Sequence, residues 1–348
     1  MSLAPRLIVV NHVLDDSDPY LSHQGQVVRM LAEHFSQITV ITGRVGSYSI
    51  PKNVSVIDTN WIPGHKIRNL LRFIWLAFPE ISSRRTQIIF SHMADLQASL
   101  ISPVARLAGK RHVFWYAHSH KSIFLTFASF FVNRIVTSTP GSCPIKGNHV
   151  SYIGQSVNPQ QFAPRSEATD TNFRFIHIGR LDRSKNIDLI IQSVLTIKGE
   201  YSQASLTLIG SSANSESIDY LEEMRERFSP EIRSGVVTFV PSVLRADLCD
   251  ELWSHDYFIH AYMGSLDKTL IEATLTRTPV ISLNLEYSKI FGTWSKLESP
   301  TLVEEFLALH AMPKDKVIEE LKRRGDIAED LHSTERWIDK LSAILISN

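Results

Sequence analysis

The stretch IHIGRLDRSKNIDLII, residues 176–191, predicts a β-strand, a short turn and the start of an amphipathic helix. The apolar strand ends at Gly179, a cation follows at Arg180, and a second cation, Lys185, stands near the predicted helix start. Arg180 can bind phosphate as a flat bidentate fork and Lys185 as a point charge, so the two can converge on one diphosphate. The plainer interpretation is that both are solvated loop charges.

The same alternation of apolar strands and helix-like segments continues along the chain in both directions. Short runs rich in Val, Ile and aromatic residues form a first series, at 6–12, 37–43, 54–59, 87–92, 112–118 and 134–138, and a second series, at 173–180, 205–210, 236–241, 257–262 and 279–284. Apolar strands that alternate with helices are typical of a parallel sheet covered on both faces. We therefore expect an α/β fold with two Rossmann-like, doubly wound domains facing across a cleft.

The length of 348 residues is about twice that of a typical domain. The segment GQSVNPQQFAPRSEATDTN, residues 154–172, is polar and contains two prolines, which is typical of a linker. These features predict an N-terminal domain over 1–160 and a C-terminal domain over 161–332. An amphipathic run at 333–347 ends the sequence.

Charge and cysteine content argue against several classes of protein. The 36 basic and 36 acidic residues balance to zero, whereas a dedicated nucleic-acid binder usually carries a strongly basic stripe. Cys143 and Cys249 are far apart and lack the spacing of metal ligands, so neither a disulfide framework nor a zinc site is indicated. We expect no nucleic-acid partner, and the cysteines fit a reducing cytoplasm.

Apolar runs are too short for a membrane span. The first, LIVV at 7–10, is shorter than a signal-peptide core, and the longest, FLTFASFFV at 124–132, is well below the ~20 residues of a spanning helix. The segment 65–85 nevertheless combines apolar with basic residues. Its charged and aromatic residues are Lys66, Arg68, Arg72, Phe73, Trp75, Phe78, Glu80, Arg84 and Arg85. Such a segment can lie peripherally on the anionic inner face of a membrane, or it can be a core helix with solvated ends.

Ligands of open α/β sheets bind outside the carboxyl ends of the strands. The residues that follow the predicted strands are Asn11, His12, His92, His118, Gly179, Arg180, Gly210 and the segment 261–268. No GxGxxG follows the first strand and no GxxxxGK[ST] occurs in the sequence. The dehydrogenase and P-loop classes therefore lose their main support.

The stretch GSLDKTLIEATLTRTPVISLN, residues 264–284, leads from one strand end through a helix into another strand. At helical spacing a narrow polar stripe is formed by Ser265, Lys268, Thr269, Glu272 and Thr276. The free amides and dipole at the helix start favour an anion. Glu272, two turns further on, can accept hydrogen bonds from sugar hydroxyls beside that anion. The alternative is a solvated polar stripe.

Together these segments resemble the retaining glycosyltransferases of family 4 (GT4), which have the two-domain GT-B fold. The motifs that carry the resemblance are GRLxxxKN (179–186), GSLDKTLIEATLTRTPVI (264–281), YIGQSVNPQQF (152–162) and WYAHSH (115–120). They occur in the order and spacing of the family, and the resemblance is strongest from 150 to 284. Similar proteins pack their last helix back near the first domain, and here that helix is 333–348.

The resemblance implies that a sugar moves from a nucleotide-sugar donor to a glycan or lipid-linked acceptor in surface polysaccharide or glycoconjugate biosynthesis. Arg180 and Lys185 would bind the donor diphosphate, Glu272 the ribose, and His118 would lie near the transferred sugar as the third catalytic residue. His120 can supply that contact instead, and His118 can be a structural histidine at a strand end. The implied donor-binding residues are Gly179, Arg180, Lys185, Gly264, Ser265, Leu266, Asp267, Lys268 and Glu272.

One position departs from the family. The family pattern is E-x7-E, and Gly264 stands where the first glutamate is expected. Glycine can let the backbone approach the donor sugar, with amides replacing the carboxylate, and Asp267 can supply a charge. The same departure supports a second hypothesis, a donor-binding partner subunit without catalysis. A third is a sugar-nucleotide epimerase of the same fold, although the sequence has no evident acid/base cluster at its strand ends.

We expect neither a metal nor another cofactor. No DxD motif lies after a strand in a position to hold a divalent ion. The DDSD run at 15–18 looks like a cluster of metal ligands, but it lies in the first loop after a strand, where we interpret it as solvated or acceptor-side. No carboxylate pair suits a double displacement. The resemblance implies a retaining, front-face transfer in which the departing phosphate takes the acceptor proton.

Overall fold

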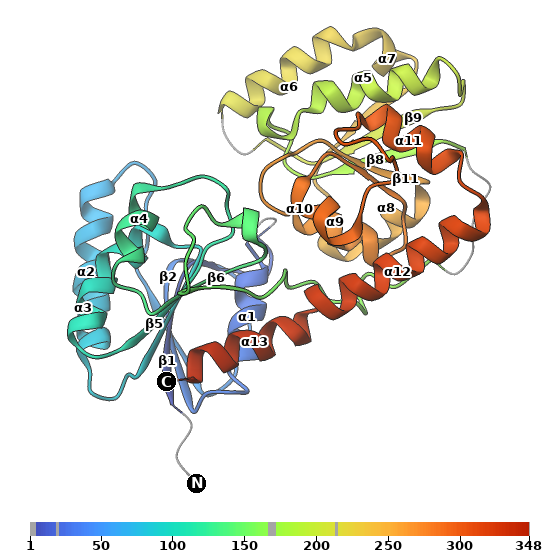
Figure 1. Cartoon of the computed structure of the whole chain (residues 1–348). Helices are drawn as coiled ribbons and strands as arrows, with labels where there is room; N and C mark the ends of the chain where they lie inside the picture. The colour runs from blue at the N-terminus through green and yellow to red at the C-terminus, as the bar shows by residue number, and fades with distance from the viewer. Residues whose placement is uncertain (1–4, 19–20, 166–171, 213–214, 348) are drawn as a thin grey trace. The chain divides into compact units, whose positions relative to one another are not determined.

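The computed structural model describes residues 5–18, 21–165, 172–212 and 215–347 (Figure 1). Contacts divide the chain into two compact units, which we describe separately. Unit 1 comprises 1–154 and 335–348, and unit 2 comprises 155–334.

Unit 1 is built on a parallel sheet in the order β3-β2-β1-β4-β5-β6-β7. Its strands are β1 (Arg6–Leu14), β2 (Gln37–Val45), β3 (Val54–Asp58), β4 (Ile88–His92), β5 (Arg111–Trp115), β6 (Arg134–Thr137) and β7 (Val150–Tyr152). The first six confirm the predicted series. The sequence did not predict β7, because its three residues are too few to form a recognisable apolar run.

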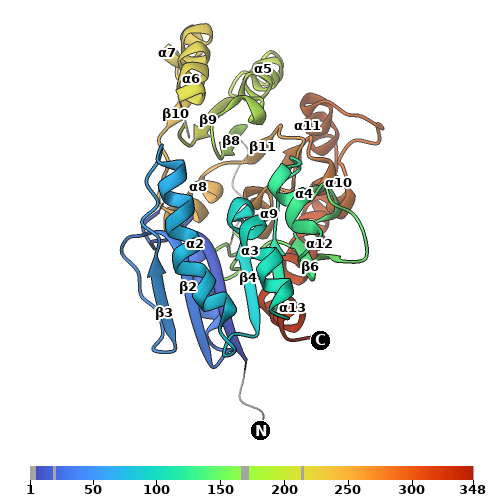
Figure 2. The same cartoon turned by 90° about the vertical axis from the view of Figure 1, so that its left-hand side faces the viewer.

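Helices cover both faces of this sheet. They are α1 (His23–Leu31), α2 (Lys66–Ser82), α3 (Asp95–Leu107), α4 (Ile123–Ser129) and the C-terminal α13 (Thr334–Ile346). Helices α1 and α13 share one core with the sheet. On the other face α2, α3 and α4 lie side by side, as Figure 2 shows. A short 3-10 turn, η1 (Pro140–Ser142), follows β6.

Unit 2 has a five-stranded parallel sheet in the order β10-β9-β8-β11-β12. Its strands are β8 (Arg174–Ile178), β9 (Ser205–Ile209), β10 (Val237–Val240), β11 (Tyr257–His260) and β12 (Val280–Ser282), all within the predicted second series. The direction in which successive strands are added reverses between β8 and β11. Strands β9 and β10 lie on one side of β8, and strands β11 and β12 lie on the other. Such a reversal opens a crevice at the carboxyl ends of the strands.

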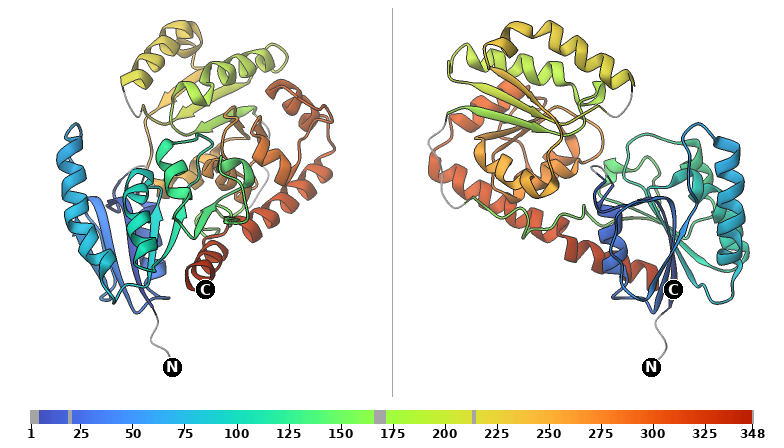
Figure 3. Two further views of the ribbon diagram at one scale, coloured as in Figure 1. Left: turned by 60° about the vertical axis from the view of Figure 1, so that its left-hand side comes forward. Right: turned by 180° about the vertical axis from the view of Figure 1, so that it is seen from behind.

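Two layers of helices enclose the sheet of unit 2 (Figure 3). One face carries α5 (Ile187–Lys198), α6 (Ser215–Arg227) and α11 (Leu302–His310), and the other carries α8 (Leu248–Ser254), α9 (Lys268–Leu275), α10 (Leu285–Phe291) and α12 (Lys314–His332). The remaining short elements are η2 (Arg183–Lys185), α7 (Ser229–Arg233) and η3 (Arg245–Asp247). Helices on both faces of a parallel sheet make each unit a doubly wound, Rossmann-like α/β domain.

The first part of the predicted linker is packed rather than solvated. Val157 and Phe162 are fully buried in the core of unit 2. Val157 also pairs with Ser333 in an isolated parallel bridge. The chain therefore belongs to unit 2 from Gln155 on, while 166–171 of the predicted linker lie outside the described residues.

Candidate functional site

The two segments singled out in the sequence meet at the crevice of unit 2. Strands β8 and β11 are hydrogen-bonded neighbours, with Phe258 opposite Ile176. The loop after β8 and the loop after β11 therefore leave the same edge of the sheet side by side. Asn186, in the left-handed conformation that Asn tolerates (φ 51°), donates a hydrogen bond of 3.0 Å from Nδ2 to the carbonyl of Ala261 and joins them.

Lys185 is not a solvated loop charge. Lys185 is the last residue of the 3-10 turn η2, whose N-cap residue, Asp182, accepts a hydrogen bond from the amide of Ser184. The residue is only 4% exposed. Its ammonium pairs with the carboxylate of Asp267 and lies 3.9 Å from the ring centroid of Tyr262, so it is held by an ion pair and a cation–π contact.

Asp267 is the centre of a small charged cluster. Its Oδ2 accepts from the Lys185 ammonium and lies 2.9 Å from Nε2 of the buried His260. Burial opposes ionisation of Asp267, but the Lys185 charge and the His260 hydrogen bond outweigh burial and hold the pKa of this carboxyl below its usual range. Burial in turn lowers the pKa of His260. Within this cluster the positive charge of Lys185 is therefore balanced by the carboxylate of Asp267.

Arg180, the other predicted diphosphate ligand, is placed differently. It follows β8 and Gly179 directly, and its side chain is 49% exposed, 3.6 Å from the carboxylate of Asp182. An ion pair so exposed holds a side chain weakly. Arg180 thus keeps a guanidinium near the crevice that an anionic ligand can recruit.

Glu272 lies in α9 and is 2% exposed, so the alternative of a solvated stripe is wrong. Helix α9 buries residues on nearly every side, from Leu270 to Leu275. The carboxylate of Glu272 accepts a hydrogen bond of 2.6 Å from Nη2 of Arg245. The pKa of Lys268, at the start of the same helix, is lowered to about 8 by burial and by the charge of Arg245, against the opposing effect of Glu272.

Sequence reasoning missed Arg245. It lies 27 residues before Glu272, in the short turn η3, and no periodic pattern connects the two. The signal that could have indicated a partner is the buried carboxylate itself, because a buried charge is rarely left unpaired. That argument requires a nearby cation but does not identify it.

The loop between β11 and α9 is held in place by two buried side-chain amides. Nδ2 of the fully buried Asn284 lies 3.0 Å from the carbonyl oxygen of Tyr262, 3.3 Å from that of Gly264 and 3.1 Å from that of Ser265. Nε2 of Gln155 donates to the carbonyl of Leu266 at 2.7 Å. Side-chain hydrogen bonds to four carbonyls fix the shape of the predicted donor-binding loop.

Gly264 is closed in by Tyr262. A Cβ atom at position 264 would lie 2.2 Å from both Cζ and Oη of that tyrosine, which is closer than real contacts allow. The phenol therefore occupies the space in the direction of a Cβ at position 264, and the expected close approach of a sugar to the backbone of Gly264 stays a prediction. Asp267, the other expected substitute for the missing glutamate, is present but already paired with Lys185 and His260.

The predicted residues of unit 1 are at the strand ends where the sequence put them. His118 is exposed three residues beyond the end of β5, and the centroid of its ring lies 5.7 Å from that of Tyr116. His120 is also exposed, and its carbonyl accepts a 2.7 Å hydrogen bond from Oη of Tyr116. Their place beside a transferred sugar stays a prediction.

The three aspartates of the DDSD run all have partners. Asp15 accepts hydrogen bonds from Ser17, Asp16 pairs with Arg29 at 2.8 Å, and Asp18 pairs with Arg44 at 2.6 Å. These contacts stabilise the loop that follows β1.

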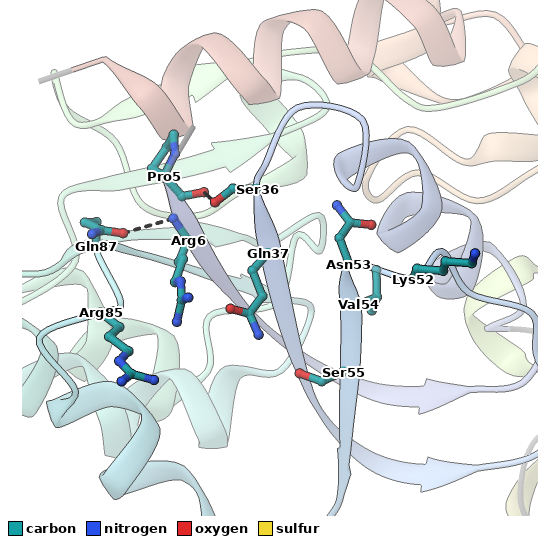
Figure 4. Close-up of a pocket in the computed structure, with 10 residues that line it drawn as sticks. All are labelled: Pro5, Arg6, Ser36, Gln37, Lys52, Asn53, Val54, Ser55, Arg85 and Gln87. Atoms are coloured by element: carbon teal, nitrogen blue, oxygen red, sulfur yellow. Dashed lines mark hydrogen bonds between the residues drawn. The ribbon is translucent and has the colours of Figure 1, made fainter. Parts of the chain in front are cut away.

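A hollow of about 600 Å³ in unit 1 lies elsewhere (Figure 4). It is found at the amino ends of β1 to β3 and just before β4, the edge opposite to the strand ends discussed above. Its lining residues are Pro5, Arg6, Ser36, Gln37, Lys52, Asn53, Val54, Ser55, Arg85 and Gln87. None of the predicted site residues is among them.

One family model matches part of unit 2. Residues 172–303 match the family model described as "Glycosyl transferases group 1". This range contains the Lys185 loop, Arg245 and α9. No curated protein sequence is significantly similar to the chain.

Solved structures resemble the chain over nearly its whole length. HepE from Anabaena, solved in complex with UDP and glucose, has a TM-score of 0.76 at 13% identity and covers 98% of this chain and 99% of its own. Sucrose-phosphate synthase from Thermosynechococcus elongatus has a TM-score of 0.76 at 14% identity, covering 97% and 98%. WaaG, a glycosyltransferase involved in lipopolysaccharide biosynthesis, has a TM-score of 0.67 at 12% identity, covering 98% and 100%. At such identities the likeness shows the fold, the GT-B arrangement of two Rossmann-like domains in one chain.

Proposed function

We propose that this protein is a retaining glycosyltransferase of the GT4 type that takes a sugar from a nucleotide-sugar donor bound to unit 2. One observation carries the proposal: a buried lysine, Lys185, and a buried glutamate, Glu272, stand at the carboxyl edge of one sheet, within the range that matches the glycosyltransferase family model. Burying two charged groups costs free energy, which their partners Asp267 and Arg245 offset in the free protein. A donor with a diphosphate and hydroxyl groups offers partners for the same cation and the same carboxylate.

The donor diphosphate would take the cations and the helix start. Lys185 and Arg180 lie on the loop after β8, and Lys268 begins α9, whose first amides carry the positive end of the helix dipole. During transfer the bond between the anomeric carbon and the phosphate oxygen breaks, and negative charge grows on the diphosphate. Preorganised cations aimed at that charge stabilise the transition state.

Glu272 would accept hydrogen bonds from the ribose hydroxyls of the donor. Its present partner, Arg245, is partly exposed and can turn aside or share the carboxylate. The acceptor hydroxyl then forms the new bond on the same face of the sugar, and its proton passes to the departing phosphate oxygen. His118 is the proposed contact near the sugar, and we propose that no metal takes part.

The acceptor is proposed to be a glycan or a lipid-linked glycan of surface polysaccharide or glycoconjugate biosynthesis. In the described part of the chain, no helix combines the length and the apolar character needed to cross a bilayer. Helix α2 instead offers a surface for peripheral contact. Ile67, Leu71 and Trp75 lie at helical spacing and are 76%, 62% and 73% exposed.

Basic residues near the exposed apolar residues of α2 also favour contact with an anionic membrane. Its other side packs Phe73, Ala77 and Ile81 into unit 1, so the apolar ridge is not needed for the core. The basic residues of the segment are Lys66, Arg68, Arg72, Arg84 and Arg85. An exposed apolar ridge with basic neighbours suits the interface of an anionic membrane. We propose that the protein works in the cytoplasm, at the inner face of such a membrane.

Product analysis after incubation with UDP-, ADP- and GDP-sugars tests the activity. We expect slow release of free sugar from one donor, or transfer when a crude lipid or glycan acceptor fraction is added, and at least tenfold loss of both in Lys185→Ala and Glu272→Ala. The matched controls are Lys316→Ala and Glu319→Ala, an exposed pair on α12. Turnover that survives both site variants contradicts the proposal.

One observation favours a second candidate, the donor-binding partner subunit. Tyr262 fills the space beside Gly264 where a family glutamate would begin. A subunit of that kind binds the donor but yields neither free sugar nor transfer with any acceptor. An epimerase would instead convert the donor alone into an isomeric nucleotide sugar.

A further inference from the structure

We infer that Tyr262 selects the donor sugar, with its phenolic hydroxyl contacting the sugar from the space that a side chain at position 264 would otherwise occupy. This inference rests on the proposed donor site in unit 2. It assigns a role to a residue that is not part of the motifs that carry the family resemblance.

The first observation is steric. Cζ and Oη of Tyr262 lie where a Cβ of residue 264 would be, at 2.2 Å. The backbone of Gly264 is not in the left-handed region, so its conformation does not itself require glycine. The phenol is what keeps this position free of a side chain. Gly264 and Tyr262 are therefore a matched pair, in which the tyrosine takes the place of the missing glutamate.

The second observation is the position of the ring beside the diphosphate lysine. The Lys185 ammonium lies 3.9 Å from the ring centroid of Tyr262. Since the donor sugar is bonded to the phosphate that Lys185 would bind, a group in contact with this ammonium is a neighbour of the sugar. Tyr262 is partly exposed, and its Oη lies 3.4 Å from Oγ of Ser265, a long hydrogen-bond distance.

The third observation is electrostatic. Lys185 already has a carboxylate partner in Asp267, and His260 binds the same oxygen. A second carboxylate at position 264 would stand beside a cation that is already neutralised. A phenol adds no charge and can both donate and accept a hydrogen bond, whereas a carboxylate only accepts. A phenol therefore suits this position better than a second carboxylate.

Calorimetric titration of four proteins tests the inference: the wild type, Tyr262→Phe, Tyr262→Ala and the control Tyr201→Phe. Tyr201 lies between α5 and β9, at the opposite edge of the same sheet. The probes are UDP, ADP and GDP and their glucose, galactose, mannose and N-acetylglucosamine conjugates. The quantity compared is the gain in affinity of the best sugar nucleotide over its own free nucleotide.

We expect Tyr262→Phe to reduce this gain about fivefold, the size of one hydrogen bond, with affinity for the free nucleotide changed less than twofold. Phenylalanine keeps the ring on Lys185, so only the hydroxyl is tested. Tyr262→Ala should also lower the affinity for the free nucleotide. Tyr201→Phe should leave the affinities for the free nucleotide and for the sugar nucleotide unchanged. An unchanged gain in Tyr262→Phe, or a wild type with no gain from any sugar, overturns the inference.

The pairing of Gly264 with Tyr262 is tested by Gly264→Ala. Its methyl group displaces the phenol, so we expect the same loss of gain as in Tyr262→Phe and no further loss when the change is added to Tyr262→Ala. If Gly264→Ala reduces the gain as much in the Tyr262→Ala variant as it does in the wild type, the pairing is contradicted. If no probe binds the wild type at all, the proposed function itself fails, which is a different result from binding without a sugar contribution.

Discussion

At the residue scale, the contact that defines the site is the one between Glu272 and Arg245. A glutamate that is almost fully buried in a helix normally destabilises a protein unless a partner compensates its charge. Here the partner comes from a separate turn, η3, and is itself partly exposed. In the free protein the pair therefore compensates the buried charge of Glu272, and its Arg245 side stays partly open to solvent.

Arg245→Ala should lower the free energy of unfolding of unit 2 by about 2 kcal/mol, because it leaves the Glu272 carboxylate buried and unpaired; the exposure of Arg245 keeps the loss below that of a fully buried pair. Urea denaturation followed by far-ultraviolet circular dichroism measures it. The double variant Arg245→Ala, Glu272→Gln should recover part of the loss.

The matched control for this prediction is Arg183→Ala, which breaks an ion pair of similar length, 2.7 Å, with Glu223. Both partners of that pair are well exposed, so we expect a change within about 0.5 kcal/mol. Equal effects of the two arginine variants would show that Glu272 does not depend on Arg245.

Single residues were predicted from the sequence to different extents. Lys185 and Glu272 belong to motifs with fixed spacing, and both are found at the predicted edge of the sheet. Arg245 and Tyr262 act through contacts in space, and neither a motif nor a helical period marks them. Such side chains become evident only when the loops around β8 and β11 are placed together.

At the element scale, strands were the easiest features to predict. Buried parallel strands are continuously apolar, which distinguishes them from their polar loops. The three-residue β7 was missed, and the packed start of the predicted linker was missed because Val157 and Phe162 are isolated apolar residues in a polar segment. The periodicity of α2 fits both of the interpretations that the sequence left open: one face is core, and the other carries Ile67, Leu71 and Trp75.

The exposed face of α2 leads to a prediction of its own. We expect the protein to float with vesicles that contain phosphatidylglycerol and to stay behind with vesicles of phosphatidylcholine alone. Leu71→Ser with Trp75→Ser should reduce flotation at least fivefold, because the apolar area inserted into the interface is lost. Lys66→Glu with Arg72→Glu should do the same and remove the salt dependence.

A control for α2 is Leu107→Ser, an exposed leucine at the end of the neighbouring α3. All these side chains are exposed, so melting temperatures should stay close to that of the wild type. If the wild type stays in the lower fraction when anionic vesicles float, the proposed membrane contact is contradicted.

At the scale of the whole molecule, two units with separate cores repeat one architecture. Each sheet reverses its strand order next to its first strand, β1 in unit 1 and β8 in unit 2, so each has one crevice at the carboxyl ends of its strands. The alternation of strands and helices survives at 13% identity to HepE. Fold is therefore far more widely shared than sequence, and function must be argued from the site.

The most direct test of the central claim, that unit 2 binds a nucleotide sugar through Lys185 and Glu272, is thermal unfolding in the presence of UDP-, ADP- and GDP-sugars. Ligand at a hundredfold excess over its dissociation constant adds about 2.7 kcal/mol of stability, equivalent to a rise of about 5–10 °C in the melting temperature of a unit of this size. We predict that at least one nucleotide sugar raises the melting temperature of the wild type and of Lys316→Ala, and that Lys185→Ala and Glu272→Ala abolish the rise. A wild type that no nucleotide sugar stabilises, or site variants that respond as the wild type does, would contradict it.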